Sequence, residues 1–157
     1  MKLSCYPIRG FHLLDKIGEG GTVELPVLAA ITIHKGDYIT PSGGYATNTA
    51  TDTATLVFGI AAEDCDNSAG ASGAKSVKVI PLLENYRFYV PVGNAALVAR
   101  ANVGVCYDLH TAYQLDLADA APATHTKGFL VEDFDASAGA IDGNAYGYAI
   151  GRFVLST

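Results

Sequence analysis

The sequence predicts an all-β fold, and three observations carry this prediction. Half of the 157 residues are apolar and only 17% are charged. Glycine is abundant at 17 residues, and Ala, Thr and Val are frequent, which favours short strands and turns over helices. Several short segments alternate apolar and polar residues between turn-forming residues. A chain of this length buries about 70% of the surface that its extended form exposes, so it folds without disulfide bonds.

The chain contains a diverged copy of part of itself. The window GIAAEDCDNSAGAS, which begins at Gly59, returns as GFLVEDFDASAGAI from Gly128, with eight identical positions of fourteen. Upstream, after a slip of one residue, Gly36 and Tyr45 fall on Gly104 and Tyr113. Duplicated strand-and-turn units usually indicate architecture before chemistry.

The repeat predicts internally duplicated strand-hairpin units within one domain. The domain is expected over residues 22–157, with the two copies at about residues 36–80 and 104–155. The repeat alone leaves open whether the copies share one barrel or form two lobes.

Residues 1–21 are predicted to form an extended N-terminal arm. Pro7 and several glycines forbid a long helix in this segment. Six of its side chains are apolar, namely Tyr6, Ile8, Phe11, Leu13, Leu14 and Ile17. The arm either forms a first strand that covers the chain's own core or docks on a neighbouring molecule.

In the first half, β-branched content and alternation predict strands at residues 22–33, 38–39, 56–62 and 76–80. Residues 46–55 have little bulk and predict an exposed loop or an edge segment, and residues 64–75 predict a polar loop. Gly59 interrupts its strand, which indicates a bulge or a close backbone approach. Val77 and Val79 are expected on one face.

In the second half, the same signals predict strands at residues 85–90, 103–109, 113–117, 128–133 and 146–155. In the first of these, Tyr86, Phe88 and Val90 are expected to point inward. In the last, alternation places Tyr146, Tyr148, Ile150 and Arg152 on one face. One short helix is predicted from Asn94 through Arg100, since Asn94 can cap it and alanines follow.

Charge and cysteine content exclude several classes of protein. The net charge of −6 and the pI near 5.0 argue against nucleic-acid binding, which depends on clustered Lys and Arg. Cys5, Cys65 and Cys106 are odd in number and widely spaced, so they are interpreted as reduced thiols without a zinc site.

No signal peptide or membrane span is predicted. Pro7 and Arg9 interrupt the first ten residues, where a signal peptide needs an apolar stretch. The longest apolar run, residues 25–33, is about half of the roughly 20 residues that a spanning helix requires.

Two acidic segments superficially resemble the opening of a calcium loop. Asp64, Asp66, Ser68 and Gly70 are echoed by Asp133, Asp135, Ser137 and Gly139. A calcium loop of the EF-hand type needs Gly at its sixth place and Glu at its twelfth. Those places hold Ala69 and Lys75, or Ala138 and Asn144. The same residue types suit hairpin loops, so we predict no metal and no other cofactor.

No catalytic arrangement emerges from the sequence, and the chain is not expected to be an enzyme. His12, His34, His110 and His125 lack metalloprotease spacing, and no serine occupies a nucleophile elbow. The pairs Glu63–Asp64 and Glu132–Asp133 would need one shielded carboxyl for acid–base chemistry. Tyr86, Tyr89, Tyr146 and Tyr148 are interpreted as core and cross-strand packing, with hydroxyls reaching the rim.

Three phrases and the closing strand resemble bacteriophage capsid decoration proteins. They are Gly36-Asp37-Tyr38 before a Gly-Gly turn, Phe58-Gly59-Ile60-Ala61-Ala62, Val103-Gly104-Val105-Cys106-Tyr107-Asp108-Leu109, and Gly147-Tyr148-Ala149-Ile150-Gly151-Arg152-Phe153. The resemblance covers roughly residues 30–155. It implies a compact β-barrel or β-tulip, a homotrimer on the outer surface of the head, and no catalytic residues. It also implies a virion protein that is made in the host cytoplasm.

The leading hypothesis is therefore a non-enzymatic phage head decoration or cement protein that stabilises the shell by bridging major capsid protein subunits. Its partners are the major capsid protein and itself, with no nucleic acid and no membrane. Contacts to the capsid or to sister subunits are assigned to Tyr6, Ile8, Phe11, Leu13 and Leu14.

Two alternatives stay open. One is a virion tail, fibre or host-recognition domain that binds carbohydrate or protein through loops and tyrosines such as Tyr45 and Tyr113. The other is a hydrolase that uses Asp or Glu, which a deep pocket with a shielded carboxyl would support.

Overall fold

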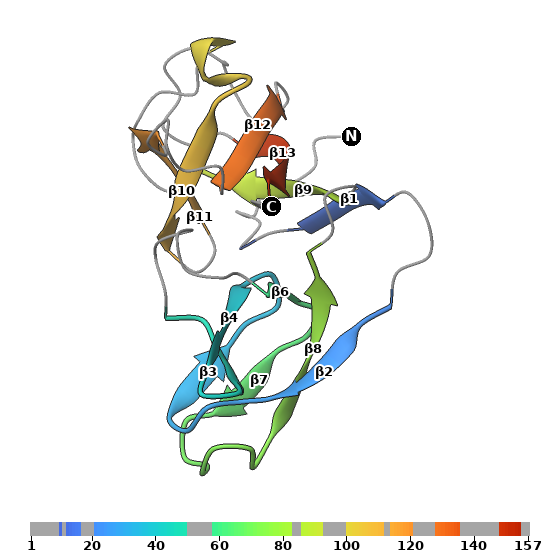
Figure 1. The fold of residues 1–157 in the computed structure, drawn as a ribbon, viewed down its shortest axis with the longest axis vertical. Coiled ribbons are helices and arrows are strands. Elements are labelled where there is room, and N and C mark those ends of the chain that lie inside the picture. The colour runs from blue at the N-terminus through green and yellow to red at the C-terminus, as the bar shows by residue number, and fades with distance from the viewer. Residues whose placement is uncertain are drawn as a thin grey trace, which may run out of the picture.

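The computed structural model describes residue 10 and residues 12–16, 21–49, 58–82, 86–92, 100–111, 114–120, 128–135 and 148–154. Within these ranges the chain forms strands and one short 3-10 helix, η1 (Arg100–Asn102). The strands are β1 (His12–Lys16), β2 (Val23–Pro26), β3 (Ile31–Ile33), β4 (Tyr38–Ser42), β5 (Tyr45–Thr47), β6 (Gly59–Ala61), β7 (Cys65–Asn67), β8 (Ser76–Pro81), β9 (Tyr86–Pro91), β10 (Cys106–Thr111), β11 (Gln114–Ala120), β12 (Gly128–Phe134) and β13 (Tyr148–Val154). The predicted all-β class is confirmed (Figure 1).

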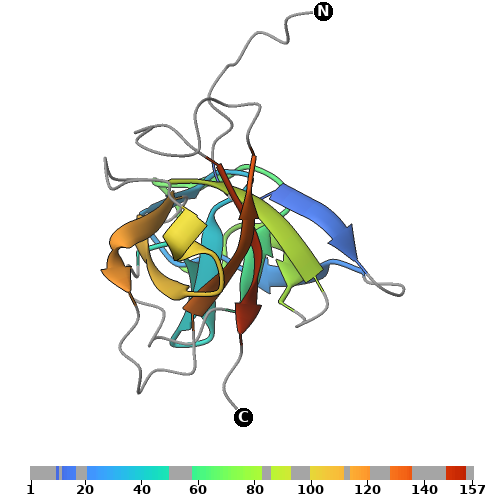
Figure 2. The same ribbon diagram turned by 90° about the horizontal axis from the view of Figure 1, so that it is seen from above.

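The strands form two large sheets and one ribbon. The six-stranded sheet has the order β1-β9-β13-β12-β10-β11, and the five-stranded sheet has the order β2-β8-β6-β4-β5. β3 and β7 pair as a separate ribbon. Neither large sheet is a closed barrel, and β1 and β11 lie at opposite margins of the larger one (Figure 2).

The chain is built as two lobes with the same strand order. The N lobe comprises the described residues between 21 and 82, and the C lobe comprises those between 86 and 154. The N lobe lies below the C lobe in Figure 1. In chain order, the five sheet strands of the N lobe are β2, β4, β5, β6 and β8, and those of the C lobe are β9 to β13. Across each sheet, the spatial order of these strands is first, fifth, fourth, second and third.

The register of the two lobes also agrees. Val23 pairs with Val79 as Phe88 pairs with Gly151. Four residues after Val23 and Phe88, a single parallel bridge links the first strand to the third, at Val27–Ala46 and at Val92–Leu115. The internal repeat therefore corresponds to two lobes rather than to two parts of one barrel.

Matching glycines precede the second strand of each lobe. Gly36 and Gly104 have φ angles of 89° and 85°, a conformation that glycine adopts without steric cost. Each N–H donates to a carbonyl of the fourth strand, Gly36 to Ala61 at 2.9 Å and Gly104 to Val131 at 2.7 Å. These are the positions at which the sequence repeat aligns the two copies.

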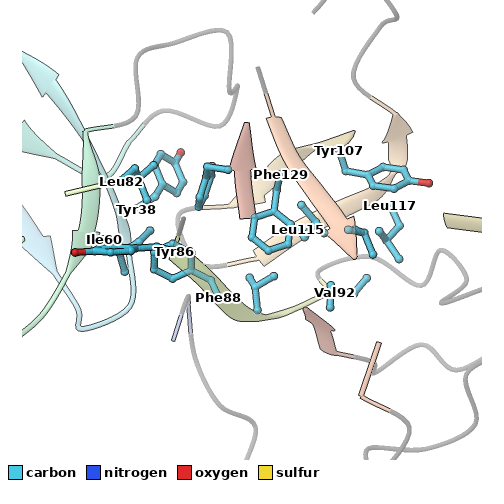
Figure 3. Packing of buried hydrophobic residues seen from close by; sticks show 14 of the residues in the cluster. Tyr38, Ile60, Leu82, Tyr86, Phe88, Val92, Tyr107, Leu115, Leu117 and Phe129 are labelled. Atoms are coloured by element: carbon cyan, nitrogen blue, oxygen red, sulfur yellow. The ribbon is translucent and has the colours of Figure 1, made fainter. Parts of the chain in front are cut away.

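Each lobe has its own core, and the C-lobe core extends into the N lobe. The N-lobe core comprises Val27, Ile33, Ile39, Ala46, Ala61, Cys65, Val77 and Val79. The larger cluster joins the inward side chains of the C lobe to three N-lobe residues, Tyr38, Ile60 and Leu82. Figure 3 shows these three side chains gathered beside Tyr86. The two lobes are thus packed against each other through apolar contacts.

The predicted strand faces are confirmed where alternation is regular. Tyr86, Phe88 and Val90 are buried, and so are Val77 and Val79. Gly59 is a close-approach site as predicted, because a Cβ there would collide with the carbonyl oxygen of Ile80.

Two element predictions are wrong and a third is confirmed only in part. The strand expected over residues 22–33 is divided into β2 and β3 by a turn in which Ala30 has a φ of 60°. The exposed loop or edge segment expected from residue 46 begins with β5, which is the edge strand of its sheet, but Ala46 and Thr47 are buried. The polar loop expected from residue 64 contains β7, which pairs with β3. In each case tertiary pairing overrides local composition.

The helix predicted from Asn94 to Arg100 lies almost wholly outside the described residues. Only its last residue is described, as the first residue of η1.

Candidate interaction surface

Only two of the five residues that were predicted to make the capsid contact lie among the described residues. Tyr6, Ile8 and Phe11 lie outside the described residues. Leu13 and Leu14 lie in β1, whose backbone pairs antiparallel with β9 of the same chain. Residues 12–16 therefore form a first strand on the chain's own sheet, one of the two arrangements that the sequence left open for the arm.

A surface of a different kind lies on the outer face of the C lobe. Because side chains alternate along a strand, the residues between the buried ones of β9, β13 and β12 all point away from the core. We name this set the Arg–Tyr face, and it comprises Arg87, Tyr89, Leu130, Glu132, Asp135, Tyr148, Ile150 and Arg152. The sequence prediction that Tyr148, Ile150 and Arg152 share a face is confirmed.

Two arginines share one carboxylate at the centre of this face. Arg87 Nε donates to Glu132 Oε2 at 2.8 Å, and Arg152 Nε lies 3.1 Å from Glu132 Oε1. The Glu132 side chain is 28% exposed and the arginines are 40% and 45% exposed. Charge-assisted hydrogen bonds of this kind hold long side chains in place, so the two guanidinium groups are positioned ahead of any contact.

A β-bulge lies in β12 at Glu132. The register of β12 against β13 shifts between Val131 and Asp133, so Glu132 is the extra residue. Glu132 lies on the outer face with Leu130, and the bulge changes the alternation after it, so that Phe134 rather than Asp133 is buried. Alternation places Glu132 on the outer face but does not show that it contacts both arginines.

Stacked tyrosines complete the face. The rings of Tyr89 and Tyr148 are stacked, with centroids 4.7 Å apart and planes 18° from parallel. The Tyr89 hydroxyl donates to Asp135 Oδ2 at 2.6 Å. The two tyrosines pack across neighbouring strands as predicted, and Tyr86 is a core residue as predicted. Tyr146 lies outside the described residues.

The equivalent face of the N lobe is an ordinary solvated surface. By the shared register, Glu24 takes the place of Tyr89, Ser76 that of Tyr148 and Lys78 that of Ile150. All three are exposed, and Lys78 Nζ lies 3.9 Å from Glu63. The C lobe thus has Tyr, Tyr and Ile where the N lobe has Glu, Ser and Lys. That difference matches the compositional difference between protein interfaces and ordinary surface.

The acidic loop of the N lobe is held by hydrogen bonds that stabilise turns. Asp64 Oδ1 accepts from the Lys35 N–H at 2.7 Å. Asp66 Oδ1 accepts hydrogen bonds from the Ser68 N–H and from the Thr32 hydroxyl. Hydrogen bonds from Ser68 make the largest contribution to lowering the pKa of Asp66, and the bond from Thr32 lowers it further. In the part of the chain that the structure describes, no three His, Cys, Asp or Glu side chains come together to hold a metal ion.

Two of the three thiols lie in described regions and neither forms a disulfide. Cys65 is buried in the N-lobe core and Cys106 is half-buried, and burial raises the pKa of both thiols. Cys5 lies outside the described residues. Raised thiol pKa values indicate packing rather than reactivity.

The tyrosines assigned to the carbohydrate-binding alternative are not brought together by described contacts. Tyr45 is half-buried in β5, and Tyr113 lies outside the described residues. The Arg–Tyr face, not this pair, is the place where aromatic and charged side chains converge.

The described ranges contain no helix long and apolar enough to cross a bilayer. Comparison with known proteins gives no assignment, since no family model, curated protein or solved structure matches the chain.

Proposed function

We propose that this chain is a non-enzymatic phage head decoration or cement protein. It acts as a homotrimer on the outer capsid surface and stabilises the shell by bridging major capsid protein subunits. The observation that supports this most directly is the Arg–Tyr face, an interface-like surface on one lobe beside a solvated surface on the other. Arg and Tyr are the residues that most often dominate protein–protein binding energy.

Two physical arguments are consistent with this role. Three linked copies gain avidity of about 10²-fold or more, so each contact can be weak. A net charge of −6 suits a protein that remains outside the head, away from packaged DNA.

The test is binding to undecorated heads of the phage that encodes the chain, measured by co-sedimentation. We expect the wild type to bind, and Tyr148→Ser and Arg152→Ala to weaken binding by about 10-fold or more, the effect of removing an interface anchor. Ser76→Ala, at the N-lobe position equivalent to Tyr148, is the matched control and should bind as the wild type does. Thermal unfolding confirms that each variant is folded.

Failure of the wild type to bind heads would reject the cement function. Wild-type binding by folded Tyr148→Ser and Arg152→Ala would instead move the capsid contact away from the Arg–Tyr face.

A second candidate is a host-recognition domain that binds carbohydrate. The stacked pair Tyr89 and Tyr148 beside Asp135 and two arginines offers the combination of aromatic rings and polar groups that orients a ligand. Glycan-array binding that is lost in Tyr148→Ser, with no binding to heads, would favour this candidate.

A further inference from the structure

The C lobe carries one strand for which the N lobe has no counterpart among the described residues. β1 pairs with the edge of β9 that faces away from β13, at residues His12 to Lys16 opposite Tyr89 to Tyr86. β2 is the N-lobe equivalent of β9, and it is the outermost strand of its sheet. Among the described strands, none pairs with the first half of its outer edge.

Side-chain exposure marks the same place. By the shared register, Val23 corresponds to Phe88, and Phe88 pairs with Leu13 of β1 and is fully buried. Val23 is 41% exposed, and it is the one large apolar side chain with high exposure among the residues that the structure describes. Gly21, Thr22 and Glu24 beside it are also exposed. Among the described strands, the N lobe thus has an open position where the C lobe has β1.

We propose that the outer edge of β2 at residues 21–24 accepts, as an added strand, residues 2–9 of a second copy of this chain. Strand addition to a free edge satisfies unpaired backbone groups and covers apolar side chains such as Val23. This proposal rests on the self-association in the proposed function, and it assigns the contact between copies to these two segments.

The composition of residues 2–9 suits this position. Lys2 and Arg9 are basic, whereas Glu24 is acidic and the whole chain has a net charge of −6. Leu3, Tyr6 and Ile8 supply apolar side chains to cover Val23. Pro7 lacks a backbone N–H, and an outermost strand tolerates proline because the backbone groups on its outer edge need no partner strand.

The position of Gly10 separates the start of the arm from β2. Gly10 lies directly against Gly36, which precedes β4, and β6 and β8 separate β4 from β2. At about 4.8 Å per strand, the path along the sheet from β4 to β2 is roughly 14 Å. Nine extended residues span about 30 Å, enough to reach a neighbouring molecule. A contact between different surfaces of successive copies closes into a ring, as a trimer requires.

Disulfide trapping tests the contact with the full-length chain. Cys5 already lies within the donor segment, so a cysteine is introduced at Thr22, Val23 or Glu24 in turn, in a Cys106→Ser background. Under mild oxidation we expect disulfide-linked multimers for at least one of these positions. The links should disappear when Cys5→Ser is added. Ser76→Cys, on a strand paired on both sides, should give none.

Two outcomes would overturn the proposal. One is the absence of intermolecular links at all three positions while light scattering still shows a trimer. The other is a disulfide formed only within single chains, which would assign the edge to the chain's own arm.

A second variant tests the edge without cysteine chemistry. Val23→Lys places a charge on the open edge and should weaken self-association by about 10-fold in light scattering, whereas Ser76→Lys adds the same charge and should not. Unchanged association of a folded Val23→Lys variant would contradict the proposal. Head binding is measured separately. Linked copies without head binding would reject the cement function alone, and head binding without linked copies would reject the strand exchange alone.

Discussion

The Tyr38 hydroxyl is a polar group that the fold buries at the contact between the lobes. It has no hydrogen-bond partner among the described residues. Burial, with a smaller contribution from the neighbouring Asp37, raises the pKa of Tyr38 to about 12. A buried hydroxyl without a partner costs stability, whereas the ring contributes to the shared core.

We expect Tyr38→Phe to be neutral or to stabilise the protein by up to about 1 kcal/mol. The pKa in the folded state lies above the ordinary value of 10.0, so the stability linked to the neutral hydroxyl is present below pH 10 and lost as the pH rises toward 12. The wild type should therefore lose stability relative to the variant between these pH values, as measured by urea unfolding. The control is Tyr107→Phe, which should lose about 1 kcal/mol because the Tyr107 hydroxyl accepts from Asn102 at 2.6 Å. A large loss in Tyr38→Phe at neutral pH would contradict this account.

Asp66 gives a second prediction at the residue scale. Hydrogen bonds from Ser68 and Thr32 hold the pKa of its carboxyl below the ordinary value of 3.8. The stability that the charged form contributes is present above pH 3.8 and lost as the pH falls through the lower folded-state pKa. We expect Asp66→Asn to lower the urea midpoint at about pH 7, with the difference from the wild type shrinking as the pH falls through the lowered pKa of Asp66. If the urea midpoints of Asp66→Asn and the wild type still differ in acid, the effect of the substitution is one of shape rather than charge. Glu24→Gln serves as a control at an exposed carboxylate.

At the scale of elements, the close pairing of β12 and β13 depends on a residue without a side chain. A Cβ on Gly151 would collide with the carbonyl oxygen of Leu130 and press on the Phe129 ring. β13 lies between β9 and β12, so neither neighbour can move away without breaking its own pairing.

We expect Gly151→Ala to destabilise the protein by about 3 kcal/mol, the upper range for overpacking, measured by chemical unfolding. Gly21→Ala is the control, since a Cβ at that position would meet no atom within 4 Å. Equal stability of the two variants would show that β13 shifts freely.

The elements also show what sequence can predict. β9 and β13 are predictable because each alternates regularly and one face is buried, so local pattern and tertiary environment agree. β5 and β7 are less predictable, because Ala46 bridges to Val27 and Cys65 pairs with Ile33, both of which are distant in sequence. The pattern alone places Tyr148, Ile150 and Arg152 on one face. Their link to Arg87 runs through Glu132 of β12, and alternation within one strand does not reveal which strands lie side by side.

At the scale of the molecule, the shared apolar cluster predicts that both lobes unfold together. Leu82 is 6% exposed and belongs to the N lobe, yet it packs in the C-lobe cluster. The repeat predicts two similar units but leaves their arrangement open, because a sequence repeat does not specify which strands pair.

We expect Leu82→Ala to destabilise the whole chain by about 2–4 kcal/mol, the range for removing a buried leucine. Native-state hydrogen exchange at Val77 and Phe129, one in each lobe, should show equal losses of protection. Val27→Ala, within the N-lobe core, serves as the comparison. Loss of protection in one lobe alone would show that the lobes unfold independently.

The common strand order of the lobes has a consequence for how the chain reaches its native state. Tandem units of one topology are prone to misassembly, in which a strand from one unit enters the sheet of the other. Here the matching core positions differ in size, with Ala46 against Leu115, Ala61 against Val131 and Val79 against Gly151. An exchanged strand would leave a void in one lobe and a clash in the other. The divergence between the copies therefore disfavours strand exchange between the lobes during folding, so that each strand pairs within its own lobe.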